Sequence, residues 1–124
     1  GSPKREFLYV DDFAEACFFL LEKGYDRQKD LPKDKNGKSI NWLNIGSDYE
    51  ISIKELTKKI SHLVGFEGDI VWDKTKPNGT PRKKLDCTHI NNLGWTAKTN
   101  LDKGILQTFN SFKNELKQNL RINL

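Results

Sequence analysis

The chain has 124 residues, of which 35% are hydrophobic and 31% charged, and its formal net charge is +4. This is the size and polar composition of one soluble domain, and no apolar run approaches the roughly 20 residues of a membrane span. The N-terminus lacks the apolar segment of a secretory signal, and Gly1-Ser2 is either native or left by cloning. The two cysteines have no companions at metal-ligand spacing, so we expect no metal site and a cytoplasmic location.

The N-terminal segment predicts a short strand. Residues 5–10, R-E-F-L-Y-V, are rich in residues that favour strands. On such a strand Arg5 would share one face with Phe7 and Tyr9, because side chains alternate between the faces. An arginine on an aromatic strand face usually has a fixed partner, and its guanidinium suits forked contacts with phosphate.

A helix should follow this strand. Asp12 and Glu15 have the spacing of a capping box, and Gly24 would end the helix. The segment between them is apolar on most faces, which predicts a helix buried between layers with Cys17 as a small core residue. Residues 26–41 are charged and predict a variable surface loop.

The middle of the chain predicts two further strands around a helix. Residues 42–47 are typical of a buried strand that ends in a turn, and residues 69–73 of a third short strand. Between them, Ser52 and Glu55 form a second capping box, and apolar residues recur at helical spacing up to Gly65.

The C-terminal part predicts two helices. Residues 88–93 should form a short helix that ends at Gly94, and residues 101–120 a long amphipathic one, with residues 121–124 frayed. Strands that alternate with helices indicate an α/β fold. We therefore expect a single domain over residues 1–124, with a small mixed or parallel sheet of short strands and packed helices.

The common signatures of nucleotide enzymes are missing. The sequence has neither G-x-G-x-x-G nor G-x-x-x-x-G-K-[ST], so it should not bind a dinucleotide or a nucleoside triphosphate through these loops. Tyr25 and Lys29 match the Y-x-x-x-K pair of short-chain dehydrogenases, but the match enters the charged loop, where no helix would align them. His62 and His89 have no visible partner, and no catalytic triad can be assembled.

Two stretches rich in cations remain, P-K-R-E-F-L-Y-V-D-D at the start and P-N-G-T-P-R-K-K-L-D at residues 77–86. The second places two prolines and a glycine directly before Arg82, Lys83 and Lys84. Such a stiff turn is expected where cations must hold an anion at a fixed distance, although a charge run is often only a solvated face. The basic balance also leaves open a module that binds nucleic acid or another polyanion.

These same stretches carry a family resemblance. With L-N-I-G-S-D-Y-E-I-S-I-K-E-L and V-G-F-E-G-D-I-V-W-D-K, they closely resemble the C-terminal part of the GDP-L-fucose synthase family, in the extended short-chain dehydrogenase/reductase group. K-P-x-G-T-P-R-K is much more specific to this family than R-E-F-L-x-V-D-D. The match covers almost the whole chain except residues 26–41 and the tail.

The resemblance implies the substrate-binding lobe of a two-domain enzyme, without its Rossmann domain. That missing domain would bind NADP(H) and carry the catalytic residues, so this chain alone would hold no cofactor and would be inactive. The whole enzyme would be a homodimeric 3,5-epimerase and 4-reductase that makes GDP-L-fucose from GDP-4-keto-6-deoxy-D-mannose. The separate chain is expected to be a monomer that contacts neither nucleic acid nor membrane.

The resemblance also implies the substrate contacts. Arg5 matches an arginine that contacts the substrate nucleotide, Lys83 a lysine that contacts its diphosphate, and Arg82 is a neighbouring candidate. Asn78 stands where the family usually has an aspartate that contacts the substrate. An amide carries no charge, so a preference for guanine that rests on this contact is open. The lobe of another nucleotide-sugar epimerase or dehydratase is therefore an alternative.

Overall fold

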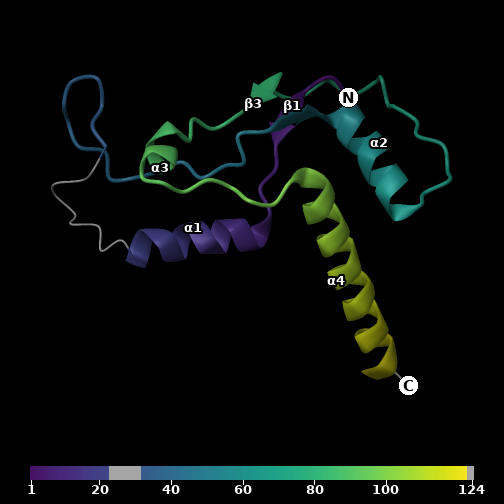
Figure 1. The fold of residues 1–124 in the computed structure, drawn as a ribbon. Helices are drawn as coiled ribbons and strands as arrows, with labels where there is room; N and C mark the ends of the chain where they lie inside the picture. The colour runs from purple at the N-terminus through teal and green to yellow at the C-terminus, as the bar shows by residue number, and fades with distance from the viewer. Residues whose placement is uncertain (23–31, 123–124) are drawn as a thin grey trace.

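The computed structural model describes residues 1–22 and 32–122, which form a small α/β fold (Figure 1). The segments 23–31 and 123–124 lie outside this description, and with them the Tyr25–Lys29 match and part of the expected 26–41 loop. The elements in chain order are β1 (Lys4–Glu6), α1 (Val10–Glu22), β2 (Glu50–Ser52), α2 (Ile53–Val64), β3 (Arg82–Lys83), α3 (Thr88–Asn92) and α4 (Leu101–Ile122).

The sheet is small and mixed, as expected. Its strand order is β2-β1-β3, so the N-terminal strand lies at the centre. β1 pairs antiparallel with β2, where Arg5 is the partner of Ile51. It pairs parallel with β3, where Lys4 is the partner of Arg82 and Arg5 that of Lys83. The first residues and the segment after the proline-rich turn, which are far apart in the sequence, therefore meet in one sheet.

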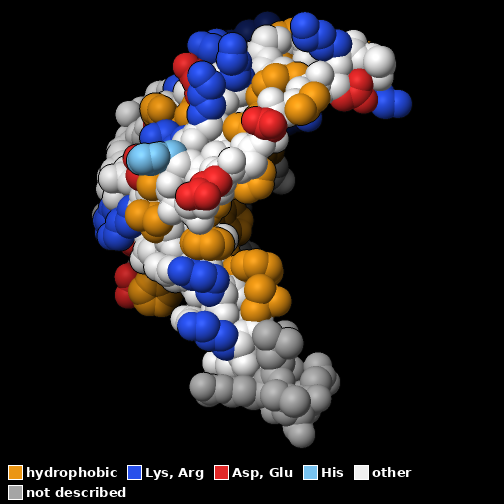
Figure 2. Space-filling model, turned by 90° about the vertical axis from the view of Figure 1, so that its right-hand side faces the viewer, with side chains coloured by type: hydrophobic (Ala, Val, Ile, Leu, Met, Phe, Trp, Pro, Cys, Tyr) orange, Lys and Arg blue, Asp and Glu red, His pale blue; other side chains and the backbone are white. Residues whose placement is uncertain are grey.

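The hydrophobic core lies between α1 and α3. Its buried members are Ala16, Cys87, Ile90 and Trp95, with partly buried Leu8, Phe19, Leu20, Ile45 and Ala97 against them. Ile51 of β2 is buried separately. Few side chains of the described residues are fully enclosed, and one face of the molecule shows hydrophobic side chains along the concave side of an arc (Figure 2).

α1 begins earlier than expected, at Val10, and Asp12 is not its cap. The helix opens instead with a backbone bond from Phe13 N to Tyr9 O at 3.1 Å. Asp12 is buried and accepts hydrogen bonds from Lys98 N, Thr99 N and Thr99 Oγ1 at 3.1, 2.8 and 2.9 Å. Asp12, which was expected to belong to a capping box, thus makes tertiary contacts that connect α1 to the segment before α4.

α2 follows the sequence closely. Ser52 and Glu55 form the expected capping box, and Gly65, at a φ of 71°, ends the helix. α4 also forms as expected and extends to Ile122. Lys59 of α2 donates to Asp102 of α4 at 2.6 Å, and the two helices lie on the same side of the molecule (Figure 1). The predicted short helix before Gly94 is α3.

Four further expectations are wrong. Residues 42–47 and 69–73 pair in no ladder, and the strand that does form in this part is β2, at residues 50–52. The first strand stops at Glu6, so Phe7 and Tyr9 do not share a strand face with Arg5. Cys17 is exposed and not a core residue, because the core lies on the opposite side of α1.

The described part of the 26–41 loop contains a tight turn. Asp34 Oδ1 accepts from Asn36 N at 2.8 Å and Lys38 N at 2.9 Å, and Gly37 takes a φ of 79°. A single bridge pairs Lys33 with Ser39. Within residues 1–22 and 32–122, no helix combines the length and the hydropathy that crossing a membrane requires.

Candidate functional site

The parallel ladder between β1 and β3 brings Arg5 and Lys83 side by side. They are direct register partners, and Lys4 N donates to Pro81 O at 2.8 Å at the start of the ladder. Directly opposed residues of neighbouring strands project from the same face of a sheet. Two cations from distant parts of the sequence therefore share one face, while Lys4 and Arg82 share the other.

The proline-rich turn passes over Arg5 and holds it. Arg5 Nη1 donates to Thr80 O at 2.8 Å and to Lys4 O at 2.6 Å. A Cβ atom added at Gly79 would lie 3.4 Å from Arg5 Nη2, an ordinary van der Waals distance, so the turn packs directly against the guanidinium. The stiff turn thus fixes the position of Arg5. Its two prolines, Pro77 and Pro81, lie on either side of Thr80, whose carbonyl oxygen accepts the hydrogen bond from Arg5.

Arg82 is committed elsewhere. Its Nε donates to Glu50 Oε2 at 2.7 Å, and Lys4 Nζ lies 3.6 Å from the other oxygen of the same carboxylate. The hydrogen bond from Arg82 holds the pKa of the Glu50 carboxyl below its usual range, and the charge of Lys4 acts in the same direction. Arg82 therefore neutralises a side chain of the protein, which weakens it as a ligand for an external anion.

Arg5 and Lys83 differ from Arg82 in this respect. Within the part of the chain that the structure describes, neither has a carboxylate at salt-bridge distance. The described hydrogen bonds of Arg5 are donated to neutral carbonyl oxygens, so they do not compensate its positive charge. Two adjacent uncompensated cations, one of them fixed in position, suit a ligand with two negative groups such as a diphosphate.

Asn78 lies in the same turn but faces the N-terminus. Its Nδ2 donates to Ser2 Oγ at 3.3 Å, and its side chain is exposed. The structure thus places Arg5, Asn78 and Lys83 around one end of the sheet and Arg82 on its far face. No local pattern indicates Glu50 as the partner of Arg82, because the two residues meet only through the registers of β2 and β3 on β1.

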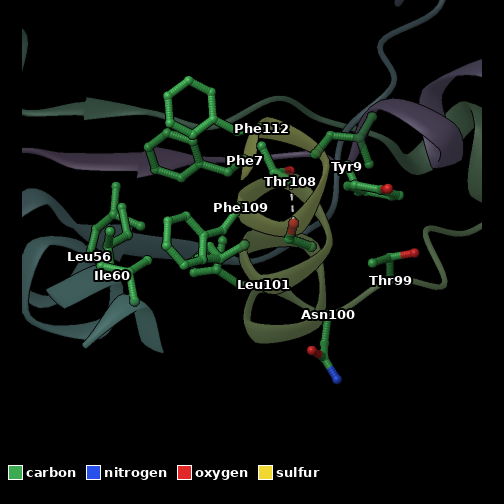
Figure 3. Close-up of a pocket in the computed structure, with 14 residues that line it drawn as sticks. Phe7, Tyr9, Leu56, Ile60, Thr99, Asn100, Leu101, Thr108, Phe109 and Phe112 are labelled. Carbon is green, nitrogen blue, oxygen red and sulfur yellow. Dashed lines mark hydrogen bonds between the residues drawn. The ribbon is translucent and has the colours of Figure 1, made fainter. Parts of the chain in front are cut away.

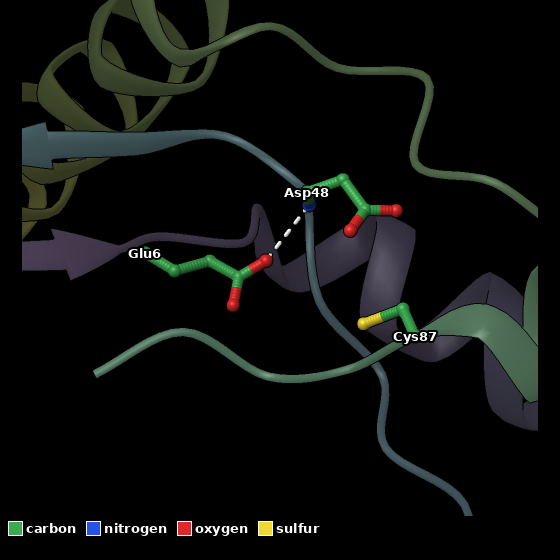
Figure 4. A group of neighbouring side chains, drawn as sticks. All are labelled: Glu6, Asp48 and Cys87. Carbon is green, nitrogen blue, oxygen red and sulfur yellow. Dashed lines mark hydrogen bonds between the residues drawn. The ribbon is translucent and has the colours of Figure 1, made fainter. Parts of the chain in front are cut away.

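A second cluster lies at the other end of β1. Glu6, Asp48 and Cys87 bring their ligand atoms within 4.8 Å of one another, an arrangement compatible with a metal ion (Figure 4). The two oxygens of Glu6 already accept from Asp48 N at 2.7 Å and Leu85 N at 2.9 Å. Burial raises the pKa of the Cys87 thiol to about 11, so the neutral thiol predominates at neutral pH. The two hydrogen bonds of Glu6 make the cluster a structural tie between β1 and the segments at Asp48 and Leu85.

An apolar groove of about 460 Å³ lies between α2 and α4. Figure 3 shows Phe7, Phe109 and Phe112 grouped opposite Leu56 and Ile60. Among the residues that the structure describes, no charged side chain lines the groove, and neither Arg5 nor Lys83 reaches it. It offers mainly apolar surface for packing, and its few polar lining groups include the hydroxyl of Tyr9.

Comparison with known proteins identifies the family of the chain. No family model matches the chain. GDP-L-fucose synthase 1 of Arabidopsis thaliana, however, is 46% identical over 109 residues, which cover 88% of this chain. The chain belongs to the GDP-L-fucose synthase family. It spans about 30% of the length of that relative.

Solved structures of GDP-sugar enzymes share the fold of this GDP-L-fucose synthase family member. A GDP-6-OMe-4-keto-L-xylo-heptose reductase from Campylobacter jejuni has a TM-score of 0.80 and 33% identity, with 92% of this chain and 32% of the other covered. A GDP-mannoheptose C4 reductase from the same organism, with NADP bound, has a TM-score of 0.73 and 31% identity over 91% of this chain and 32% of its own.

Proposed function

We propose that the chain is the C-terminal, substrate-binding part of a GDP-L-fucose synthase-like enzyme, in which Arg5 and Lys83 bind the diphosphate of a GDP-sugar. The whole enzyme would be an NADPH-dependent 3,5-epimerase and 4-reductase that converts GDP-4-keto-6-deoxy-D-mannose to GDP-L-fucose. The observation that carries the proposal is the β1–β3 register, which puts two uncompensated cations on one face. We take the anion to be the diphosphate of a GDP-sugar because the relatives are named as GDP-sugar enzymes.

The two cations have different parts in this binding. Thr80 O fixes the guanidinium of Arg5, so its free nitrogens can meet two phosphate oxygens without a search through rotamers. Lys83 is exposed, and its ammonium group would add a point charge at the second phosphate. Together they would hold the diphosphate at a set place, so that the sugar points toward the catalytic part of the enzyme.

NADP(H) does not fit the residues of this chain. A dinucleotide phosphate usually sits at a helix N-terminus that a glycine-rich turn leaves open. Here the three long helices α1, α2 and α4 each carry an acid in the first turn, and the N-terminus of α2 is closed by its capping box. We therefore assign the cofactor to the rest of the enzyme, and expect the 124-residue chain alone not to turn over the keto-sugar.

Nucleotide binding by the 124-residue chain tests the proposal. We expect GDP to bind weakly in calorimetry, with Lys83→Ala lowering the affinity roughly 3- to 10-fold, as for one exposed charge-assisted contact. Arg82→Ala is the matched control and should change the affinity less than about twofold. Equal losses in both variants, or no GDP binding at low salt, would overturn the assignment.

Asn78 supports one alternative, the equivalent lobe of another nucleotide-sugar epimerase or dehydratase. It replaces the usual aspartate with a neutral amide that is engaged with Ser2. Titration with UDP under the same conditions separates the two, because the proposed enzyme should prefer GDP. A polyanion module would instead bind duplex DNA with a steep loss of affinity as salt rises.

A further inference from the structure

The sequence contains two pairs in which an asparagine precedes a glycine, and the structure places them in different surroundings. Asn36-Gly37 lies in the tight turn of the 26–41 loop, and Asn78-Gly79 in the proline-rich turn. In such a pair the backbone nitrogen of the glycine can attack the amide carbon of the asparagine side chain. Glycine favours this attack because no Cβ atom obstructs the approach of the two groups. The local backbone then decides which pair reacts.

Hydrogen bonds hold the first pair in place. Gly37 N donates to Asp34 O at 2.9 Å, so the nitrogen that would attack is occupied. Asn36 N donates to Asp34 Oδ1 at 2.8 Å, and Lys38 N donates to the same oxygen at 2.9 Å. Asp34 therefore fixes the backbone on both sides of the pair. An attack by Gly37 N requires this turn to open first.

The second pair has no comparable restraint. Within residues 1–22 and 32–122, the backbone nitrogens of Asn78 and Gly79 donate no hydrogen bond. Both residues are exposed, and neither belongs to a helix or a strand. The side chain of Asn78 makes one long contact at the surface, from Nδ2 to Ser2 Oγ at 3.3 Å. The nitrogen of Gly79 is therefore available without any prior opening.

The prolines of this turn stiffen it on both sides of the pair. Proline fixes its own φ and also restricts the residue before it. Pro77 and Pro81 therefore constrain residues 76–77 and 80–81. The pair lies between these constrained positions, so it keeps the rotational freedom that closure of a ring between side chain and backbone needs.

A positive charge lies beside the second pair. The position of a Cβ atom at Gly79 is 3.4 Å from Arg5 Nη2, so the guanidinium packs against this peptide unit. Arg5 is held there by its hydrogen bonds to Thr80 O and Lys4 O. The ring closure passes through a deprotonated backbone nitrogen and an oxyanion, and a neighbouring cation stabilises negative charge at both. Arg5 therefore favours the reaction at Gly79.

We propose that Asn78-Gly79 is a site of spontaneous deamidation, at which Asn78 is converted to aspartate and isoaspartate. Gly79 N forms a bond to Asn78 Cγ, the Cγ–Nδ2 bond breaks, and ammonia leaves with the proton of the backbone nitrogen. Water then opens the resulting succinimide at either carbonyl group. Each product carries a carboxylate in the turn that packs against Arg5, in place of a neutral amide. The inference does not depend on the proposed function, since it uses only the chemistry of the turn.

The two pairs can be compared in one sample. The 124-residue chain is incubated in mildly alkaline buffer, and peptide mapping by mass spectrometry follows the loss of Asn36 and Asn78. We expect Asn78 to react roughly fivefold faster, because the reaction of Asn36 first requires a hydrogen bond of about 1 kcal/mol to break. In concentrated urea the two rates should become similar, since the turn at Asp34 is lost. A rate at Asn78 that does not exceed the rate at Asn36 in native buffer would overturn the proposal.

Two variants test the cause of the difference. Gly79→Ala places a Cβ atom next to the attacking nitrogen and should strongly slow the loss of Asn78, while the loss of Asn36 continues as before. Asp34→Ala removes the acceptor of two backbone hydrogen bonds, so it should raise the rate at Asn36 toward that at Asn78. Loss of Asn78 at an undiminished rate in Gly79→Ala would show hydrolysis without ring closure and would contradict the proposal.

A last pair of variants tests the neighbouring charge. Arg5→Gln should slow the loss of Asn78 roughly threefold, as for the removal of one nearby exposed charge. Arg5→Lys keeps the charge and should not slow it. The Asn36 rate, measured in the same samples, is the internal control and should be equal in both variants. An Asn78 rate that is unchanged in Arg5→Gln would overturn the role assigned to Arg5.

Discussion

Arg5 and Lys83 are direct partners in the parallel ladder of β1 and β3, although most of the chain lies between them. Arg5 is also fixed from the side, since it donates to Thr80 O across a sequence separation of 75 residues. The two segments that carry cations in the sequence thus lie side by side in one sheet. The proline-rich turn contributes rigidity, and β1, as the central strand, contributes the position.

Arg5→Lys should loosen the proline-rich turn while it keeps the charge. Lysine lacks the fork that reaches Thr80 O, and a lost hydrogen bond of about 1 kcal/mol corresponds to roughly fivefold faster local opening. Hydrogen exchange of the amides at residues 79–83 measures this opening. Arg82→Lys is the control, because Arg82 bonds to Glu50 on the other face, and unchanged exchange in Arg5→Lys would contradict the prediction.

Asp12→Ala should destabilise the fold by about 2–3 kcal/mol. The buried carboxylate accepts three hydrogen bonds, and its removal leaves Lys98 N and Thr99 N without partners in a partly buried place. Urea unfolding followed by circular dichroism gives the difference. The neighbouring exposed Asp11, changed to alanine, should cost less than about 1 kcal/mol, since it loses only its interaction with the helix dipole and a surface hydrogen bond with Tyr9. Similar losses in both variants would show that Asp12 acts only as a helix-start acid.

Glu50→Gln should flatten the acid side of the stability curve. In the folded chain Arg82 and Lys4 lower the pKa of Glu50 below its ordinary 4.5. A group with a lowered folded pKa stabilises the fold above its unfolded pKa, and this contribution is lost as the pH falls toward the folded pKa. The difference between wild type and variant should therefore shrink below about pH 4.5 and be constant above about pH 6. Glu67→Gln, at an exposed residue without a described ion pair, is the control, and the test fails if both differences follow the same course.

Gly46→Ala should disturb the tie between Glu6, Asp48 and Cys87. A Cβ atom at this buried glycine would lie 2.5 Å from Glu6 Oε1 and 3.0 Å from Cys87 Sγ, so neighbours must move. We expect a loss of about 1–3 kcal/mol in thermal or urea unfolding, as for other overpacked sites. Gly79→Ala is the matched control, because its nearest neighbour is a flexible arginine end at 3.4 Å. A fully stable Gly46→Ala would show that the tie adjusts without strain.

Local signals in the sequence predicted the helices well. The Ser52–Glu55 box and the Gly65 end of α2 depend on residues three to twelve positions apart, so the sequence contains all that they need. α3 and α4 were found for the same reason. The start of α1 was misplaced because Asp12 binds Lys98 and Thr99, which no local pattern reveals.

The strands were harder, because pairing is not a local property. Residues 42–47 and 69–73 have the composition of strands but no partner in a ladder among the described residues. β3 has only two residues, both cations, and nothing in their composition favours a strand. Its existence depends on the rigid turn before it and on the free edge of β1. The cation pair could therefore be expected from the resemblance, while the commitment of Arg82 to Glu50 could not.

The parallel pairing of β3 with β1 has a consequence for how the molecule folds. The residues that pair in this ladder are far apart in the sequence. Such contacts form slowly, because the chain loses conformational entropy on closing the loop before the contacts stabilise it. A two-residue strand repays little, so β3 is the segment most easily released from the sheet. An anion bound across Arg5 and Lys83 would clamp β3 to β1, and ligand concentration would then shift the thermal midpoint of the chain itself.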